Sequence, residues 1–234
     1  MPPLTPARRR GYEVLDDPAV PAAARERSLR DVVRSNTLFG GARALLRELR
    51  AVLPPAGTSA TLLDVGTGLA DLPRRAERMA ARRGVRLATI GYDVAPSLLR
   101  AARPSLTHAA CGDALALSFA ARSVDFVTCS QLLHHFEPDD ARRLLRELHR
   151  VARCAVIVSD LRRSWIAVTG FWLASFPLGF HPITRHDGVT SVLRGFTARE
   201  LAGLVRDATG VAPRVTRHAG FRLTARWTTG APAA

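Results

Sequence analysis

Lysine is absent from this 234-residue sequence, so all 34 of its basic side chains are arginine, and the formal net charge is +14. Basic patches can neutralise nucleic-acid phosphates. Here, however, the arginines are spread through segments such as 74–86 and 141–150, where they fall mainly on the solvated faces of expected helices. Complete replacement of lysine is more typical of an arginine-biased genome than of a selected binding surface. We therefore expect loose attraction to anionic surfaces and no nucleic-acid partner.

Cysteine is also scarce, with three residues whose spacing matches no metal-ligand pattern. Cys111 and Cys129 lie in or beside apolar runs, which predicts buried, reduced thiols. No charged leader with a short apolar stretch and a small-residue cleavage site opens the sequence. These absences predict a cytoplasmic protein with no structural metal. Residues 1–22, which contain proline and arginine, are expected to form a flexible tail.

The composition, 47% hydrophobic and 23% charged, is that of an ordinary globular protein, and we expect a single domain over 23–234. Strand and helix signals alternate along it, which is typical of an α/β fold with a doubly wound sheet and helices on both faces. The expected strands are 61–65, 86–93, 106–113, 124–130, 154–160, 212–218 and 221–227. The expected helices are 23–52 (broken at Gly40-Gly41), 69–83, 95–103, 139–152 and 196–210. The last two strands predict an antiparallel ending to a mostly parallel, seven-stranded sheet.

Ligands bind at the carboxyl ends of the strands in such sheets. The first strand ends at Asp64, followed by Gly66-Thr67-Gly68, and glycines let the backbone approach a ligand. The dinucleotide-binding pattern needs a small third residue where this sequence has Asp71. Two carboxylates facing a pyrophosphate would be unfavourable, so a nicotinamide oxidoreductase is the weakest hypothesis. A cationic ligand fits better.

The next two expected strands also end in acids. Asp93 follows Gly68 at the distance of an acid that binds two ribose hydroxyls. Asp113 could accept a hydrogen bond from the exocyclic amine of adenine. Acids at three successive strand ends predict an adenosine with a cationic amino-acid tail. Aspartates that only cap helices are the less favoured interpretation.

The segments "LLDVGTGLAD", "IGYD", "CGDALAL" and "VDFVTCSQLLHHF" closely resemble class I S-adenosylmethionine-dependent methyltransferases over residues 58–160. The small-molecule branch that includes ubiquinone- and menaquinone-biosynthesis enzymes is the most similar. The resemblance implies a Rossmann-like fold and S-adenosyl-L-methionine as cofactor. It implies the following cofactor-binding residues: Asp64, Gly66, Thr67 and Gly68 at the methionine moiety, Asp93 and Val94 at the ribose, Asp113 and Ala114 at the adenine, and Ser130 and Gln131 at the amino-acid end. The third glycine of the family is Ala70 here, from which we expect a slightly tighter loop.

Methyl transfer from a sulfonium depends mainly on alignment of the acceptor with the methyl group. A base is needed only if the acceptor loses a proton. His134 and His135 follow the fourth expected strand at the methyl end, so either could be a catalytic base. The sequence does not choose between them, and either imidazole could instead pack or cap the following turn.

Residues 164–184 contain no Arg, Asp or Glu and are rich in Trp and Phe. Their length is near that of a membrane span, but Gly and Pro interrupt them, so we expect a buried insertion. In related methyltransferases this region forms the acceptor pocket, and we expect one over 161–196 for a lipophilic or aromatic acceptor. Peripheral membrane contact and a plain core helix are the alternatives. The segment 23–54 is expected to form a helical lid over the cofactor. Candidate pocket residues are Asn36, Phe39, Asp160, Trp165, Trp172 and His186, with an ion pair from Asp160 to Arg162 or Arg163 as a structural alternative.

The sequence thus predicts a methyltransferase acting on an oxygen or carbon atom of a polyketide-, phenol- or quinone-like molecule. One alternative, suggested by the charge, is an RNA or protein methyltransferase. Enzymes that methylate base amines carry an Asn/Asp-Pro-Pro-aromatic motif where this chain has "CSQLLHH", which counts against it. A non-catalytic protein that binds S-adenosylmethionine is the other alternative.

Overall fold

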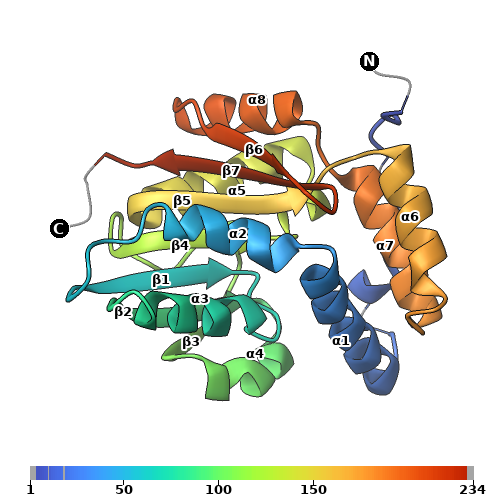
Figure 1. Cartoon of the computed structure of the whole chain (residues 1–234), viewed down its shortest axis with the longest axis horizontal. Coiled ribbons are helices and arrows are strands. Elements are labelled where there is room, and N and C mark those ends of the chain that lie inside the picture. The colour runs from blue at the N-terminus through green and yellow to red at the C-terminus, as the bar shows by residue number, and fades with distance from the viewer. Residues whose placement is uncertain (1–3, 10, 18, 231–234) are drawn as a thin grey trace.

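The computed structural model describes residues 4–9, 11–17 and 19–230, and its centre is a seven-stranded sheet (Figure 1). The strands are β1 (Ser59–Val65), β2 (Arg86–Asp93), β3 (His108–Cys111), β4 (Val124–Ser130), β5 (Ala152–Leu161), β6 (Arg214–His218) and β7 (Arg222–Thr228). Their order is β3-β2-β1-β4-β5-β7-β6, and β7 runs antiparallel to both of its neighbours. The expected Rossmann-like, mostly parallel sheet with an antiparallel C-terminal strand is confirmed.

Central strands of this sheet are apolar on both faces because helices cover both sides. In β1, Leu62 points into one apolar cluster and Leu63 into the other, as the two-residue period of a strand requires. Two helices, α2 (Gly41–Arg50) and α3 (Asp71–Ala81), complete the first cluster. Two others, α5 (Pro138–Val151) and α8 (Ala198–Thr209), complete the second. The alternation of strands and amphipathic helices in the sequence therefore produces a three-layered molecule.

The helices fall into two groups. Those that cover the sheet are α2 (Gly41–Arg50), α3 (Asp71–Ala81), α4 (Pro96–Ala102), α5 (Pro138–Val151) and α8 (Ala198–Thr209), with short 3-10 turns η2 (Arg103–Ser105) and η3 (Leu133–His135). The others, α1 (Ala22–Leu38), α6 (Trp165–Ser175) and α7 (Pro182–Arg194), lie together beyond the carboxyl ends of β1, β4 and β5 (Figure 1). The 3-10 turn η1 (Val14–Asp16) packs on α7. The second group covers the edge of the sheet where ligands bind.

The strand order reverses between β1 and β4, which are neighbours in the sheet. Such a switch point leaves a crevice at the carboxyl ends of the two strands, because the following loops leave in opposite directions. The residues after Asp64 and after Ser130 therefore face each other. Among the described residues, no helix is both long and apolar enough to cross a bilayer.

Two expectations need correction. Cys111 is exposed because β3 is a short edge strand, whereas Cys129 is buried in β4. The apolar insertion is also not buried throughout, since Trp172 and Leu173 of α6 are exposed. Residues 4–9 and 11–17, within the expected flexible tail, contact α7 and the start of α6, as in the hydrogen bond from the Trp165 amide to the Leu4 carbonyl.

Candidate functional site

A cavity of about 370 Å³ opens at the switch point, between the carboxyl ends of the strands and helices α1, α6 and α7. Its lining includes ten residues expected to bind cofactor or acceptor or to act in catalysis: Asn36, Asp64, Gly66, Thr67, Gly68, Asp93, Ser130, Gln131, His134 and His135. Eleven further lining residues are apolar: Leu15, Leu29, Val32, Val33, Leu69, Leu72, Leu98, Leu132, Leu161, Phe171 and Val192. Charged residues of the lining that the sequence did not predict for the site include Glu13 and Arg222. Most of the predicted cofactor residues therefore meet in one place.

The loop between β1 and α3 requires glycine at two positions. Gly66 has φ +73°, and a Cβ there would lie 2.8 Å from the Leu132 side chain. Gly68 has φ +53°, and its missing Cβ leaves open space on the cavity side. Ala70 also adopts the left-handed conformation, with φ 55°, and ends the loop just before α3. The loop backbone can therefore approach a ligand closely.

Asp64 lies beneath this loop and is almost fully buried. Burial raises its pKa to about 6, although a hydrogen bond from the Thr128 hydroxyl at 2.7 Å acts in the opposite direction. A buried carboxyl with a raised pKa carries an unfavourable charge that a cationic ligand would relieve. This is the electrostatic environment expected for an ammonium or sulfonium group.

Asp93 ends β2 and is held in place by the backbone. Its Oδ2 accepts a hydrogen bond from the Gly68 amide at 2.9 Å, and its Oδ1 accepts one from the Ala95 amide at 3.0 Å. Each carboxylate oxygen retains a lone pair. Asp93 can therefore receive a pair of ribose hydroxyls while it fixes the glycine loop.

Several buried polar atoms that line the cavity have no hydrogen-bond partner in the described structure. They include Asn36 Oδ1, Ser130 Oγ, His134 Nε2 and Arg222 Nε. Buried polar groups in proteins are nearly always paired. Their gathering on one cavity, beside the open space at Gly68, indicates that the residues present fit a polar ligand such as the expected cofactor.

Arg222 begins β7 and lines the cavity, although only 3% of its surface is exposed. Its Nη1 donates a hydrogen bond of 2.7 Å to Gln131 Oε1. Burial lowers the pKa of Arg222 to about 10, with nearby Asp160 opposing the shift, so the guanidinium stays protonated at neutral pH. A buried cation with an unpaired Nε is a receptor for an anionic group.

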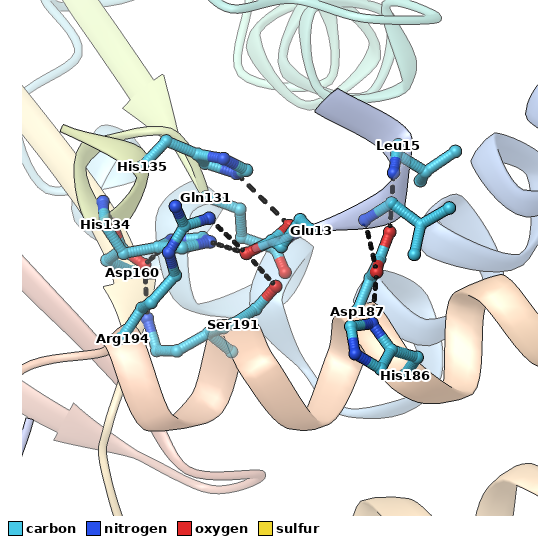
Figure 2. Close-up of polar contacts among 12 residues, drawn as sticks. Glu13, Leu15, Gln131, His134, His135, Asp160, His186, Asp187, Ser191 and Arg194 are labelled. Carbon is cyan, nitrogen blue, oxygen red and sulfur yellow. Dashed lines mark hydrogen bonds and ion pairs between the residues drawn. The ribbon is translucent and has the colours of Figure 1, made fainter. Parts of the chain in front are cut away.

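His134 in η3 is oriented by Asp160 at the end of β5 (Figure 2). The distance between His134 Nδ1 and Asp160 Oδ1 is 2.7 Å, and the His134 amide donates to Asp160 Oδ2 at 3.1 Å. Burial alone would raise the pKa of Asp160, but the imidazole of His134 outweighs it and holds the pKa below its ordinary value. The ionised carboxylate fixes the proton on Nδ1, so Nε2 is the basic nitrogen of a residue that lines the cavity. The alternative pairing of Asp160 with Arg162 or Arg163 is not among the described contacts, and Arg163 instead pairs with Glu200.

Glu13 lies against the histidine pair, as Figure 2 shows. Its carboxylate is 3.8 Å from Nε2 of His134 and 3.8 Å from Nε2 of His135. On its other side it accepts hydrogen bonds from Ser191 and Arg194 of α7, both at 2.9 Å. Glu13 is therefore a buried acid that contacts both candidate bases.

The same three side chains could hold a metal ion, because their ligand atoms lie within 4.8 Å of one another. Two imidazoles and one carboxylate suit zinc or another divalent transition metal. The Arg194 guanidinium, however, already supplies positive charge to Glu13 at 2.9 Å. The absence of a metal, expected from the sequence, stays a prediction.

Asp187 of α7 fixes the segment that carries Glu13. Its two carboxylate oxygens accept hydrogen bonds from the amides of Val14 and Leu15, at 2.8 and 2.9 Å. Asp187 also lines the cavity. The N-terminal segment and α7 together thus close the side of the cavity that faces the histidines.

Three predicted cofactor residues lie outside the cavity lining, near the β2 and β3 edge. Val94 is 73% exposed, and Asp113 is exposed with its Oδ1 accepting a hydrogen bond from the Leu115 amide. Ala114 packs against the apolar cluster beneath it. Their role in binding ribose and adenine stays a prediction.

Five predicted pocket residues do not line the cavity: Phe39, Asp160, Trp165, Trp172 and His186. Trp165 and Trp172 point outward from α6, which corrects the expectation that they face the acceptor. His186 belongs to an outer groove and lies 2.9 Å from Asp187. Phe39 ends α1 and packs on Phe171, which is the aromatic side chain that does line the cavity.

Sequence reasoning missed Glu13 and Arg222 at the site, and it considered Asp187 able to reach the acceptor but favoured a surface turn. Glu13 was assigned to the tail, and Arg222 is one of many arginines in the chain. Asp187 stands in the segment "RHDG", which reads as a surface turn. Of the two missed residues, only Arg222 could have been found, because it stands at the start of a strand that runs antiparallel to β5. The start of such a strand lies at the carboxyl end of β5, which is the ligand-binding edge of the sheet.

Residues 62–154 match the family model of a methyltransferase domain. No curated protein sequence matches the chain. Among solved structures, a possible histamine N-methyltransferase from Thermotoga maritima aligns with 88% of this chain and 98% of its own, at 16% identity and a TM-score of 0.60.

Two further structures align over most of their length. A putative methyltransferase in complex with the Trm112 activator of Haloferax volcanii covers 94% of this chain and 99% of its own, at 14% identity and a TM-score of 0.58. Magnesium protoporphyrin IX methyltransferase from Synechocystis, with bound S-adenosylhomocysteine, covers 91% and 89%, at 15% identity and a TM-score of 0.54. At these sequence identities the comparison shows that the fold is shared.

Proposed function

We propose that the chain carries a class I S-adenosylmethionine-dependent methyltransferase domain and that it methylates an oxygen or carbon atom of a lipophilic or aromatic small molecule. S-adenosylmethionine, when bound, supplies the methyl group on a sulfonium leaving group. The residues of this chain hold the two reactants in line and accept the proton of the acceptor. In-line positioning can contribute about 7–11 kcal/mol to such a reaction.

The observation that carries this proposal is the dyad of His134 and Asp160. His134 lines the cavity, and its basic nitrogen, Nε2, is buried and makes no hydrogen bond among the described residues. Asp160 sets the tautomer and stabilises the imidazolium that forms when Nε2 takes the proton of an acceptor hydroxyl or activated carbon. Of the two candidate histidines, His134 is thus favoured as the base, because Asp160 orients its imidazole at 2.7 Å.

The cofactor tail has matching charges in the cavity. Asp64 presents a buried carboxyl for the positive end, and Arg222 presents a buried guanidinium for the α-carboxylate. Gln131 fixes the orientation of Arg222 through the 2.7 Å hydrogen bond. We propose that these groups bind the amino-acid portion, while Asp93 binds the ribose.

The part of the cavity where the acceptor would bind is apolar, which supports a lipophilic substrate. Leu29, Val32 and Val33 of α1 and Phe171 of α6 form an apolar wall opposite the strand ends. Apolar cavities with a few polar groups are typical of small-molecule sites. Phe171 takes the role that the sequence had suggested for Trp165 and Trp172.

The test is to incubate the protein with S-adenosylmethionine and a panel of lipophilic phenols, quinols and polyketides, and to detect a gain of one methyl group by mass spectrometry. Against the best acceptor, His134→Gln is expected to lower kcat by about 10²–10⁴-fold, the usual contribution of a general base. Asp160→Asn should act in the same direction because it disturbs the tautomer of His134. His135→Gln is the matched variant and should have a smaller effect.

Cofactor affinity, measured by calorimetry, should stay unchanged in these variants. The assignment of the base is wrong if His134→Gln keeps the wild-type kcat across the pH range. The acceptor class is wrong if only small polar molecules are methylated.

A further inference from the structure

Helix α6 exposes a row of large apolar side chains, which we call the outer α6 face. It consists of Trp165 (39% exposed), Ile166 (52%), Trp172 (49%), Leu173 (57%) and Phe176 (49%). These are five of the nine exposed large hydrophobic residues in the part of the chain that the structure describes. Concentrated exposed apolar surface of this kind marks an interaction site.

The arrangement follows from the helical period. Residues seven apart, such as Trp165 and Trp172, share one side of a helix. The opposite side carries the buried Ala167 and Ser175 and also Phe171, which lines the cavity. In Figure 1, α6 forms the edge of the molecule, with α7 on its inner side. The outer α6 face is therefore apolar without being part of the core.

Arginines border this face, and acids are missing from its sequence neighbourhood. Between Asp160 and Asp187 the chain has no acidic residue. The guanidinium carbon of Arg185 lies 4.6 Å from the ring centre of Phe176, and that of Arg9 lies 5.8 Å from Trp165. The face is an aromatic surface with a cationic rim.

An adjoining groove continues this chemistry. It lies between α6 and α7, has a volume of about 450 Å³, and has walls of Trp172, Phe176 and Val189 beside the basic side chains Arg185 and His186. An acyl chain or an anionic headgroup matches such a groove. Trp and Phe together with basic side chains are typical of helices that lie in the interface of a membrane.

We propose that the outer α6 face docks on the surface of an anionic phospholipid bilayer, with α6 lying in the plane of the interface. Eleven residues make a helix of about 16 Å, well short of the roughly 30 Å hydrocarbon core, so α6 cannot span it. A second copy of the chain is the poorer occupant. A dimer would bring together two arginine rims on molecules that each have a net charge of +14, so the two copies would repel each other. An anionic membrane surface would instead attract this positive charge.

This docking places the cavity next to the bilayer, because Phe171 is on the other side of the same helix. The consequence, which rests on the proposed function, is that a lipid-soluble acceptor reaches the cavity from the membrane. Vesicle binding itself needs no methyl transfer, so the docking proposal and the proposed function can fail separately.

The test is co-sedimentation of the protein with vesicles of phosphatidylcholine alone and of phosphatidylcholine with about one quarter phosphatidylglycerol. We expect binding to the anionic vesicles, weakened by salt, and a blue shift of tryptophan fluorescence. Trp165 and Trp172 report on the face, while Trp227 is buried and should not respond. Leu173→Glu should weaken binding at least about 10-fold, because it removes apolar contact and adds a negative charge that the anionic surface repels.

The matched control is Leu38→Glu, which introduces the same charge at a leucine that is 51% exposed on α1, outside this face. It should bind vesicles nearly as well as wild type, and both variants should bind S-adenosylmethionine normally. The proposal is overturned if anionic vesicles are not bound, or if the two variants lose affinity equally. It is also overturned if light scattering shows a dimer that Leu173→Glu converts to a monomer and vesicles are not bound.

Discussion

Asp64 is the residue whose ionisation should control cofactor binding, because burial raises its pKa to about 6. Above that pH the carboxylate is charged and attracts a cationic tail, whereas below it the neutral carboxyl does not. We expect the affinity for S-adenosylmethionine, measured by calorimetry, to rise up to about 10-fold per pH unit between about pH 5 and 6 and to level off above about pH 7. Asp64→Asn should lower the affinity and remove this dependence. An affinity of the wild type that is constant over this range would contradict the assignment.

Arg222 provides a second test at the residue scale, by comparison of two ligands. S-adenosylhomocysteine has an α-carboxylate, and 5′-methylthioadenosine lacks the whole amino-acid tail. Arg222→Met should weaken binding of S-adenosylhomocysteine by about 10–100-fold, the effect of one charge-assisted hydrogen bond. Binding of 5′-methylthioadenosine should be nearly unchanged. Equal loss for both ligands would mean that Arg222 only maintains the shape of the cavity.

Among the secondary-structure elements, α7 holds the N-terminal segment through Asp187. Asp187→Ala removes the acceptors for the Val14 and Leu15 amides, so the segment should separate from α7 and take Glu13 away from the histidines. Hydrogen exchange of residues 11–17 should become faster by about 10-fold or more, because each lost hydrogen bond contributes about 1 kcal/mol. Asp187→Asn keeps one acceptor oxygen, so its exchange rate should lie between those of the wild type and Asp187→Ala. Unchanged exchange in Asp187→Ala would show that other contacts hold the segment.

For the molecule as a whole, the net charge of +14 means that self-repulsion opposes the compact state. Salt screens this repulsion, so raising NaCl from about 20 mM to about 300 mM should stabilise the protein. We expect a rise in Tm of about 2–4 °C, which corresponds to about 1 kcal/mol for a chain of this size. A fall in Tm would show that ion pairs such as Arg163–Glu200 contribute more to stability than the repulsion costs.

The residues predicted from the sequence agree with the structure on the cofactor side of the cavity but not on the acceptor side. Asp64, Gly66, Gly68 and Asp93 were predicted at the ligand edge, and the structure brings them together there. The aromatic residues of the insertion were expected to face the acceptor. An apolar run does not show which of its faces will meet the protein, and in α6 both tryptophans point outward.

The sequence alone determined the fold and the cofactor side, because each glycine or acid directly follows a strand, and parallel strands necessarily end at the same edge of the sheet. Only the tertiary structure decided the acceptor side. There Glu13, His134 and Arg194 converge from distant parts of the chain. Contacts between such distant residues arise from the packing of α1, α6 and α7 on the edge of the sheet, and no local pattern encodes them.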